Sequence, residues 1–264
     1  MTQFRELIHL GLQRYQPHIA LRPWIECYWV VANCRSSTEY LYPDGGSSLI
    51  FDLTGRDLYP ATFTAHQAPQ VFAVTGPLFG VRFRAVGAHR LLGLPMGELG
   101  GGCLSEAHLV VPNLLELCER MVAKSIPAQV MAVDQWMLAQ ARTHSCSETL
   151  GERLPAQVTS QSGSIKELLS GLGVSRRTAE RQVKEQTGCT LRQLLAWSRV
   201  KRARHLIKLN QECTLTEIGL MCGYYDQSHF VREFRKATSF SPIEYRKRQR
   251  SRIRDGEMEV STSG

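Results

Sequence analysis

The stretch CTLTEIGLMCGYYDQSHFVREFRKATSFSPIEYRKR, residues 213–248, decides the fold of the C-terminal third of the chain. Thr214 and Glu217 stand three residues apart, which is the spacing of a capping box at a helix N-terminus. A turn containing Gly223 follows, and Asp226 is placed to cap a second helix. A helix, a turn with glycine and a second capped helix form the helix-turn-helix pattern, whose second helix enters the major groove of DNA.

Helix start signals are dense in the whole region from residue 164 onward. The capping boxes pair Ser164 with Glu167, Thr190 with Gln193, Thr214 with Glu217, and Ser241 with Glu244. The last box has Pro242 at the first helical position, where proline is favoured. Because each box precedes an apolar pattern of helical period, this region is predicted to be all α.

The same region repeats itself. Residues 164–168 correspond to 214–218 at an offset of 50, and Gly173 falls on Gly223. After the turn the offset is 51, so that Ser175 matches Asp226 and Arg181 matches Arg232. Residues 191–209, between the copies, carry an apolar stripe and predict one long connecting helix. The sequence therefore predicts two helix-turn-helix units, whose second helices must lie ~34 Å apart to enter successive major grooves.

The second helix of each copy has a polar face suited to duplex DNA. Arginine pairs with guanine edges, glutamine with adenine, and serine, threonine or lysine with bases and phosphates. The opposite faces are apolar and are expected to pack into the core: Ala179, Val183, Phe230 and Phe234. The candidate DNA-binding residues are Arg176, Arg177, Glu180, Arg181, Lys184, Gln227, Ser228, His229, Arg232 and Arg235.

Positive charge is concentrated in this repeat. The 264-residue chain has a net charge of +8, yet residues 1–163 carry 12 Lys/Arg against 13 Asp/Glu, a net of −1. Residues 164–255 carry 20 against 9, a net of +11, and the last nine residues add −2. Such asymmetry indicates a polyanionic partner. A run of ~18 apolar residues that could span a bilayer is absent, as is a signal-peptide pattern, so we expect no membrane partner and a cytoplasmic, nucleoid-associated location.

The N-terminal half has a different pattern. Short segments of strand character, separated by turn signals such as 43–46, predict a β-rich domain. The alternation of apolar and basic residues at 80–84 predicts a half-buried strand. Residues 112–142 change to a helical period and are a candidate homodimer surface. The segments expected as strands are 24–32, 39–42, 47–53, 72–75 and 80–85.

The expected fold class is therefore α+β, with a β-rich sensing domain and an all-α domain of two helix-turn-helix units. The domain boundaries are 1–142 for the β-rich domain with its C-terminal helices, 143–163 for a linker, 164–250 for the DNA-binding domain and 251–264 for a disordered tail.

The C-terminal region resembles the DNA-binding domain of the AraC/XylS family of bacterial transcription regulators and activators. The resemblance is carried by residues 213–248, by VSRRTAERQVKEQTGCT upstream, and by Arg199 and Ala203 in the connecting helix. The resemblance implies base contacts at Arg177, Glu180 and Arg181 in the first unit. In the second unit it implies Gln227, Ser228, His229 and Arg232. Ser239-Phe240 departs from the glycine-containing step of the family, and Glu180 is acidic, which favours an ion pair with Lys184 over contact with a cytosine amino group.

More loosely, YPDG at 42–45, TGP at 75–77 and GVRFR at 80–84 resemble the sensing domain of one branch of this family. The resemblance implies double-stranded promoter DNA as partner, a small-molecule effector and contact with RNA polymerase. Aromatic residues that either line an effector pocket or form an ordinary core are Trp24, Tyr28, Trp29, Tyr40 and Phe51.

Enzymatic function is the competing class. The sequence has no GxSxG, Walker A or GxGxxG element in the required context, its N-terminal histidines are isolated, and its eight cysteines show no zinc spacing. We expect no catalytic residues, no metal and no cofactor, and buried reduced thiols. Asp44 and Asp52, eight residues apart, are expected in turn and strand-end roles rather than as a catalytic pair. The alternative stays open that a β-domain enzyme or ligand-binding protein uses the basic domain only to localise to nucleic acid.

Overall fold

The chain forms two compact units, whose main segments are Gln3–Leu194 and Leu195–Gly264. The boundary lies inside helix α7 (Leu191–Leu209). Of the expected linker, 143–163, only Thr143 is described. The computed structural model describes residues 12–32, 37–55, 60–99, 103–105, 109–122, 124–143, 175–210 and 212–261.

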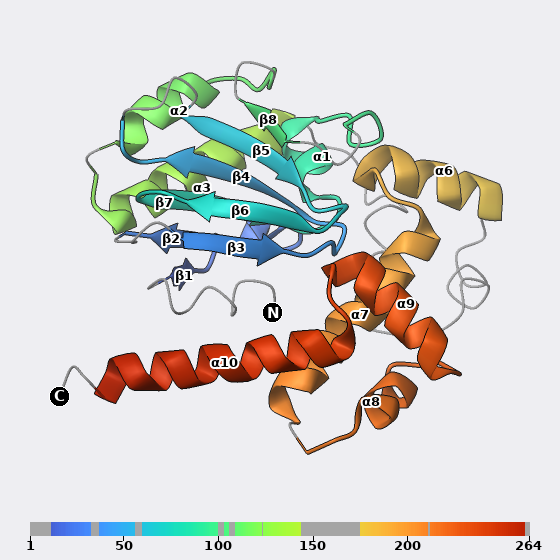
Figure 1. The fold of residues 1–264 in the computed structure, drawn as a ribbon. Coiled ribbons are helices and arrows are strands. Elements are labelled where there is room, and N and C mark those ends of the chain that lie inside the picture. Colours follow the sequence, from blue (N-terminus) through green and yellow to red (C-terminus); the bar gives the residue numbers. More distant parts are fainter. Residues whose placement is uncertain are drawn as a thin grey trace. The chain divides into compact units, whose positions relative to one another are not determined.

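An antiparallel sheet is the centre of the first unit. A second sheet pairs β3 (Ser37–Leu41) with β6 (Gln70–Val74), and Figure 1 shows this pair in front of the larger sheet, with helix α3 behind it. The helices described between residues 12 and 143 are η2 (Ile19–Leu21), α1 (Gly87–Leu92), α2 (Leu114–Met121) and α3 (Ile126–Thr143). The order of the six-stranded sheet is β1 (Gln13–Tyr15), β2 (Ile25–Val31), β7 (Leu78–Phe83), β4 (Ser47–Asp52), β5 (Ala61–Ala65) and β8 (Cys103–Ser105).

Both faces of this sheet are covered. On the helix side, Phe51 and Phe79 pack with Val133 and Met137 of α3 in the main core. On the other side, Trp29 belongs to a smaller cluster that includes residues of β4, β6 and β7. Trp29 is opposite Gly80 in the register, and a Cβ at Gly80 would lie 1.9 Å from the indole, so only glycine leaves room for this tryptophan.

This burial corrects one expectation. Residues 80–83 of the segment predicted as a half-buried strand at 80–84 belong to the interior strand β7, and every residue of β7 is buried. Arg84, which follows β7, is exposed. The basic residue Arg82 is only 1% exposed. The physical reason is that β7 lies between β2 and β4 in a sheet with both faces covered. In such a strand the side chains on both faces are buried, so an alternation of apolar and basic residues does not indicate that one face is exposed to solvent.

From residue 175 onward, the described residues form α6 (Arg176–Thr187), α7, α8 (Leu215–Met221), α9 (Gln227–Thr238) and α10 (Pro242–Ser261). The capping boxes at Thr190, Thr214 and Ser241 are confirmed by reciprocal hydrogen bonds, whereas the box at Ser164 lies outside the described residues. Residues 251–261, expected in a disordered tail, belong to α10. Ser239, in the Ser239-Phe240 step where the resemblance implies a glycine, ends α9 with a left-handed φ of 65°.

The apolar faces of these helices are buried as expected. Ala179 and Val183 of α6 are fully buried. On α9, Phe234 is fully buried and Phe230 is 1% exposed. Phe234 continues an aromatic row from Phe230, 5.6 Å away between ring centroids, to Tyr245 of α10, 5.4 Å away. The connecting helix buries its stripe at Leu194, Trp197, Val200, Ala203 and Ile207.

Candidate nucleic-acid interface

Helix α9 is fixed at its N-terminus by Asp226, whose side chain accepts a hydrogen bond from the His229 amide over 2.7 Å. The chain enters α9 through a tight turn in which Gly223 has a φ of +82°. Because Phe230 and Phe234 anchor one face in the core, the opposite face is presented to solvent. Gln227, Ser228, Arg232 and Arg235 are exposed on α9, and His229 is half-buried.

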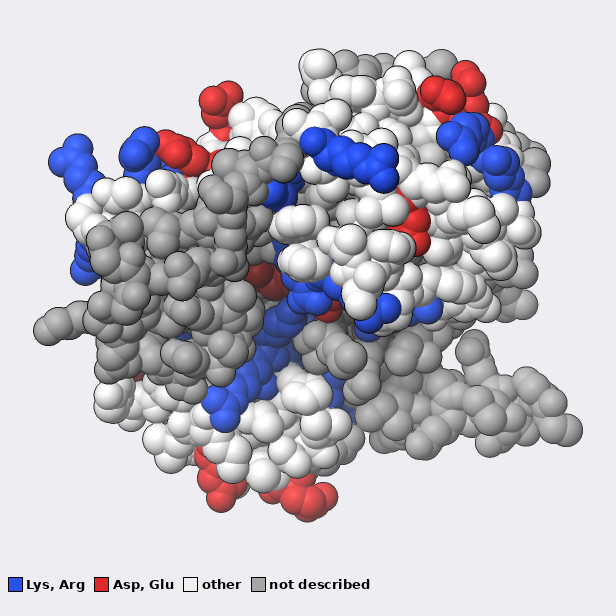
Figure 2. Space-filling model, turned by 180° about the vertical axis from the view of Figure 1, so that it is seen from behind, with Lys and Arg blue, Asp and Glu red and all other residues white. Residues whose placement is uncertain are grey.

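Helix α6 is built in the same way. The Ser175 hydroxyl accepts from the Thr178 amide over 3.1 Å, and Gly188 ends the helix in a left-handed conformation. The four cationic candidates on α6 are exposed: Arg176, Arg177, Arg181 and Lys184. Figure 2 shows that lysine and arginine side chains reach the molecular surface in groups.

The arginines of the two helices differ in their partners. Arg176 donates to Glu180 over 2.8 Å, and Arg181 pairs with Glu185 over 3.4 Å. The expected ion pair of Glu180 with Lys184 is therefore wrong: Glu180 pairs with Arg176, one turn earlier on the helix. Within the described parts of the chain, Arg177 and Arg232 make no ion pair, so both are available to an external partner.

One polar cluster on α9 was not predicted. His229 Nε2 lies 3.3 Å from the Glu233 carboxylate, and Arg199 of α7 reaches the same carboxylate at 3.3 Å. Tyr224 stacks edge-on against the His229 ring, with centroids 5.4 Å apart. The spacing of His229 and Glu233 on one helix could have indicated their contact, but no local pattern indicates Arg199, which is 34 residues away.

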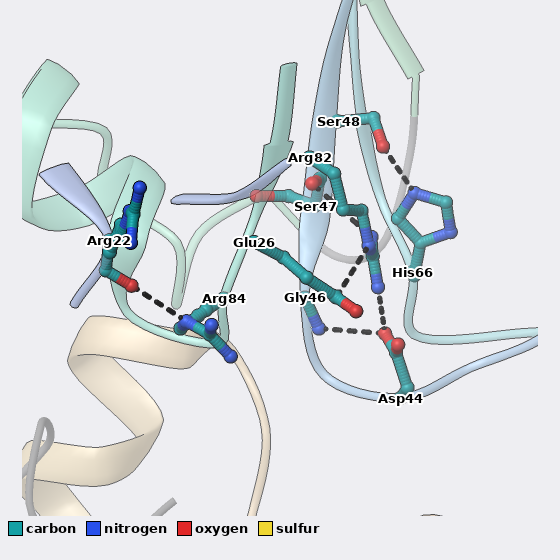
Figure 3. A network of polar contacts seen from close by, with 9 residues as sticks. All are labelled: Arg22, Glu26, Asp44, Gly46, Ser47, Ser48, His66, Arg82 and Arg84. Atoms are coloured by element: carbon teal, nitrogen blue, oxygen red, sulfur yellow. Dashed lines mark hydrogen bonds and ion pairs between the residues drawn. The ribbon is translucent and has the colours of Figure 1, made fainter. Parts of the chain in front are cut away.

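A second polar cluster is buried in the first unit (Figure 3). Asp44 accepts hydrogen bonds from the Gly46 amide, over 3.0 Å, and from the Arg82 guanidinium. Arg82 also donates to the Ser47 carbonyl over 3.2 Å and lies 3.9 Å from Glu26. The expected turn role of Asp44 is thus confirmed, and Asp52 likewise takes a strand-end role by accepting from the Thr54 amide.

His66 completes this cluster from the loop after β5. Its Nε2 atom is 3.0 Å from the Ser48 hydroxyl, and its side chain is buried. Burial, assisted by the positive charge of Arg82, lowers the pKa of His66 from 6.5 to about 3. The imidazole is therefore neutral in the folded protein at every physiological pH.

The shift of His66 predicts a pH-dependent stability. Because the unfolded chain binds a proton at His66 near pH 6.5 and the folded chain does not, stability is complete above that pH and is lost as the pH falls toward 3. We expect a loss of about 1.4 kcal/mol per pH unit below 6 from this residue. Urea denaturation of the full chain at pH 7, 6 and 5, compared with His66→Gln, measures it. Equal slopes for the two proteins would contradict the prediction.

The candidate effector residues are brought together only in part. Tyr28 and Phe51 both pack against Phe79 in the main core, whereas Trp29 points to the opposite face of the sheet. Trp24 lies at the edge of the main core, and Tyr40 is half-buried on β3. The Tyr28 hydroxyl donates to Asp134 of α3 over 2.7 Å.

The thiols described are buried or half-buried and unpaired by disulfides. Burial raises the pKa of Cys27 to about 11 and that of Cys189 to about 12, which opposes formation of the reactive thiolate. In the described ranges, no group of three or more His, Cys, Asp or Glu side chains is arranged to hold a metal ion. Likewise, no described helix has both the length and the apolar character needed to cross a membrane.

A complete helix-turn-helix in α8 and α9, with a second capped basic helix in α6 and the connecting helix α7, defines the class of a helix-turn-helix domain. The first helix and the turn at Gly173 that were expected before α6 lie outside the described residues. The sequence model of a helix-turn-helix domain matches residues 168–248, and that of a domain of unknown function (DUF6597) matches residues 13–105. The HTH-type transcriptional activator RhaS of Escherichia coli O139:H28 (strain E24377A / ETEC) is 40% identical over 73 residues, which are 28% of this chain and 26% of RhaS. The chain carries a helix-turn-helix domain of the AraC/XylS type over residues 168–248.

Two solved structures are similar to parts or most of the chain. The C-terminal domain of AraT, a response regulator from Geobacillus stearothermophilus, is 29% identical and covers 39% of this chain and 88% of that chain, with a TM-score of 0.36. ToxT from Vibrio cholerae is 13% identical and covers 89% of this chain and 97% of that chain, with a TM-score of 0.43. The family assignment of residues 168–248 depends on the domain match and on the sequence identity to RhaS.

Proposed function

We propose that this protein is a sequence-specific transcription regulator that reads two successive major grooves of a promoter with helices α6 and α9. The observation that carries the proposal is the two-sided character of α9. One face is locked into an aromatic core by Phe230 and Phe234, and the other exposes Gln227, Ser228 and Arg232. These are side chains that bind base edges, on the second helix of a helix-turn-helix.

The roles of the individual side chains follow from their partners. Arg177 and Arg232 make no ion pair with described residues, so we assign them to base edges. Arg176 and Arg181 are held by glutamates on their own helix, which suits contacts to phosphates at the rim of the interface. Lys184 and Arg235 are exposed on the last turns and are assigned to phosphates as well.

Residues 1–142, the β-rich domain with its C-terminal helices, are proposed to sense a signal. Small-molecule binding near Tyr28, Phe51 and Trp24 is proposed because these aromatic side chains gather in or against the main core, and ligand sites are rich in aromatic residues. Exposed apolar side chains at Leu115 and Met131 support a homodimer through residues 112–142. We also propose that the protein contacts RNA polymerase and that it is located in the cytoplasm in association with the nucleoid. It is proposed to have no catalytic activity.

The test is selection of bound duplexes from random DNA by the full chain, followed by affinity measurements on the selected site. We expect nanomolar binding that is at least ~10³-fold tighter than binding to random DNA. We also expect the affinity to fall steeply between 50 and 200 mM salt, by about 10³-fold if six phosphates are neutralised.

Equal affinity for selected and random duplexes at physiological salt would overturn this proposal. That result would favour the alternative of an enzyme or ligand-binding β domain whose basic helices only localise it to nucleic acid. Turnover or a tightly bound small molecule in the full chain would then identify that alternative activity.

A further inference from the structure

Two neighbouring tyrosines in the turn between α8 and α9 have opposite environments. Tyr224 is 3% exposed, and its ring centroid lies 5.1 Å from that of Phe230 and 5.4 Å from that of His229. Tyr225 is 98% exposed, which is the highest value among the exposed large apolar and aromatic side chains of the described residues. The turn therefore buries one tyrosine in the core of the second unit and holds the other in solvent.

The structural role open to Tyr225 is filled by its neighbour. An apolar residue directly before a helix cap commonly packs on the fourth residue of the helix and fixes the angle at which the chain enters. Asp226 caps α9, so this pair would consist of Tyr225 and Phe230. Here Tyr224 packs on Phe230 instead. Because Tyr225 is almost fully exposed, it contributes no packing to the start of α9.

The position of Tyr225 along the chain places it at the edge of the proposed interface. In a helix-turn-helix the N-terminal residues of the second helix contact base edges. Gln227 and Ser228 are the first two residues of α9, and both are exposed. One residue, the cap Asp226, separates them from Tyr225. Entry of α9 into the major groove therefore brings the Tyr225 side chain to the sugar-phosphate backbone that borders the groove.

Tyrosine has the chemistry to bind this backbone. Its hydroxyl donates a hydrogen bond to a phosphate oxygen, and its ring covers the apolar part of the neighbouring sugar. The Asp226 carboxylate beside it can only accept hydrogen bonds, and it already accepts from the His229 amide. Of these two neighbours, only the phenol of Tyr225 can donate to a phosphate.

We propose that Tyr225 is a further DNA-contacting residue, whose hydroxyl donates to one phosphate beside the groove that α9 enters and so positions the helix. This inference rests on the proposed function, because it requires α9 to bind duplex DNA. The contact is neutral, so it adds affinity without displacing a counterion. It carries no base information, in contrast to the contact assigned to Arg232.

A protein partner is the competing occupant of this corner. Leu220 and Met221, on the last turn of α8, are 60% and 49% exposed, and such side chains suit a protein surface. Tyr225 is assigned to DNA because it adjoins the exposed first turn of α9, where Gln227 and Ser228 are the proposed base contacts. The experiments below distinguish the two occupants.

Tyr225→Phe removes the hydroxyl alone and is the first test. The full chain and the variant are titrated with the selected duplex at several salt concentrations. We expect the variant to bind about tenfold more weakly, the effect of one hydrogen bond to a charged group, and to lose the same factor on random DNA. The slope of log affinity against log salt should stay unchanged, whereas Arg235→Ala should reduce it by about 1.

The second test locates the phosphate. Single methylphosphonate linkages, which lack the phosphate charge, are placed in turn along the selected duplex. At one linkage beside the groove of α9, the wild type should lose about tenfold in affinity, and Tyr225→Phe should lose much less. The reason is that both changes remove the same hydrogen bond, so their effects do not add. Fully additive losses at every linkage would overturn the proposal.

The matched control is Ile243→Ala. Ile243 is 69% exposed in the first turn of α10, outside both recognition helices, and its loss should leave DNA binding as in the wild type. Tyr225→Phe should keep the urea midpoint of the wild type, because the Tyr225 side chain is almost fully exposed. The loss of affinity then reports on the interface and not on folding.

The outcomes separate this inference from the proposed function. If the wild type binds no duplex in preference to random DNA, the proposed function fails. If the wild type binds its selected duplex and Tyr225→Phe binds it equally well, the role of Tyr225 fails while the proposed function stands. Normal DNA binding by Tyr225→Phe with a loss of transcription activation would assign the corner to a protein partner and would also overturn the inference.

Discussion

Asp44→Asn is expected to destabilise the first unit by about 3 kcal/mol, because removal of one partner from a buried ion pair leaves the other charge uncompensated. Arg82 cannot relieve this by losing its proton, since a guanidinium stays charged in proteins. The second carboxylate, Glu26, is 3.9 Å from Arg82 and compensates only in part, compared with the direct hydrogen bond from Arg82 to Asp44. The turn keeps an acceptor, because the asparagine oxygen can take the hydrogen bond that Asp44 accepts from the Gly46 amide, so the loss comes from the missing charge.

Urea denaturation of the full chain at pH 7, followed by the fluorescence of the buried tryptophans, measures this loss. Asp52→Asn is the matched control: it removes an aspartate from a strand end and is expected to cost less than about 1 kcal/mol. The double variant Asp44→Leu with Arg82→Met should recover much of the stability, because apolar pairs commonly replace buried ion pairs at little cost. A loss below about 1 kcal/mol for Asp44→Asn would show that Asp44 is not the main counter-ion of Arg82.

The helical domain could be predicted because its signals are local. A capping box is read from residues three positions apart, and the boxes at Thr190, Thr214 and Ser241 form as expected. The caps fix where α7, α8 and α10 begin, and the apolar period then fixes which faces are buried. Phe230 and Phe234 are in the core for this reason, and the exposure of Arg232 follows from the same period.

The buried network of the first unit could not be predicted in the same way. Arg82 and Asp44 are 38 residues apart and meet only through the register of β4 and β7. An alternation of apolar and basic residues is the same in a strand at the edge of a sheet and in a strand in its interior, so the pattern does not distinguish the two positions. By contrast, the separation of Tyr28 from Trp29 was open to prediction, since neighbouring residues of a strand point to opposite faces.

Arg177→Ala and Arg232→Ala are each expected to weaken binding to the selected duplex by about 1–3 kcal/mol, which is about fivefold to 150-fold. Both side chains are exposed and make no ion pair with described residues, so truncation removes a contact to DNA without breaking one inside the protein. They lie on α6 and α9, in different compact units, and share no partner in the described structure. Their effects should therefore add in the double variant, to about 2–6 kcal/mol.

The measurement is the dissociation constant of the full chain and its three variants for the selected duplex at one salt concentration, with a random duplex beside it. Arg192→Ala is the control, because it removes one exposed arginine of α7 outside both recognition helices. If each recognition helix reads its own groove, each single variant relaxes the base preference at a different position, and the losses add. A double variant no weaker than the worse single would mean that only one of the two helices reads DNA. If the variants lose the same amount of affinity for random DNA, both arginines contact phosphates rather than base edges, because phosphate contacts carry no sequence information.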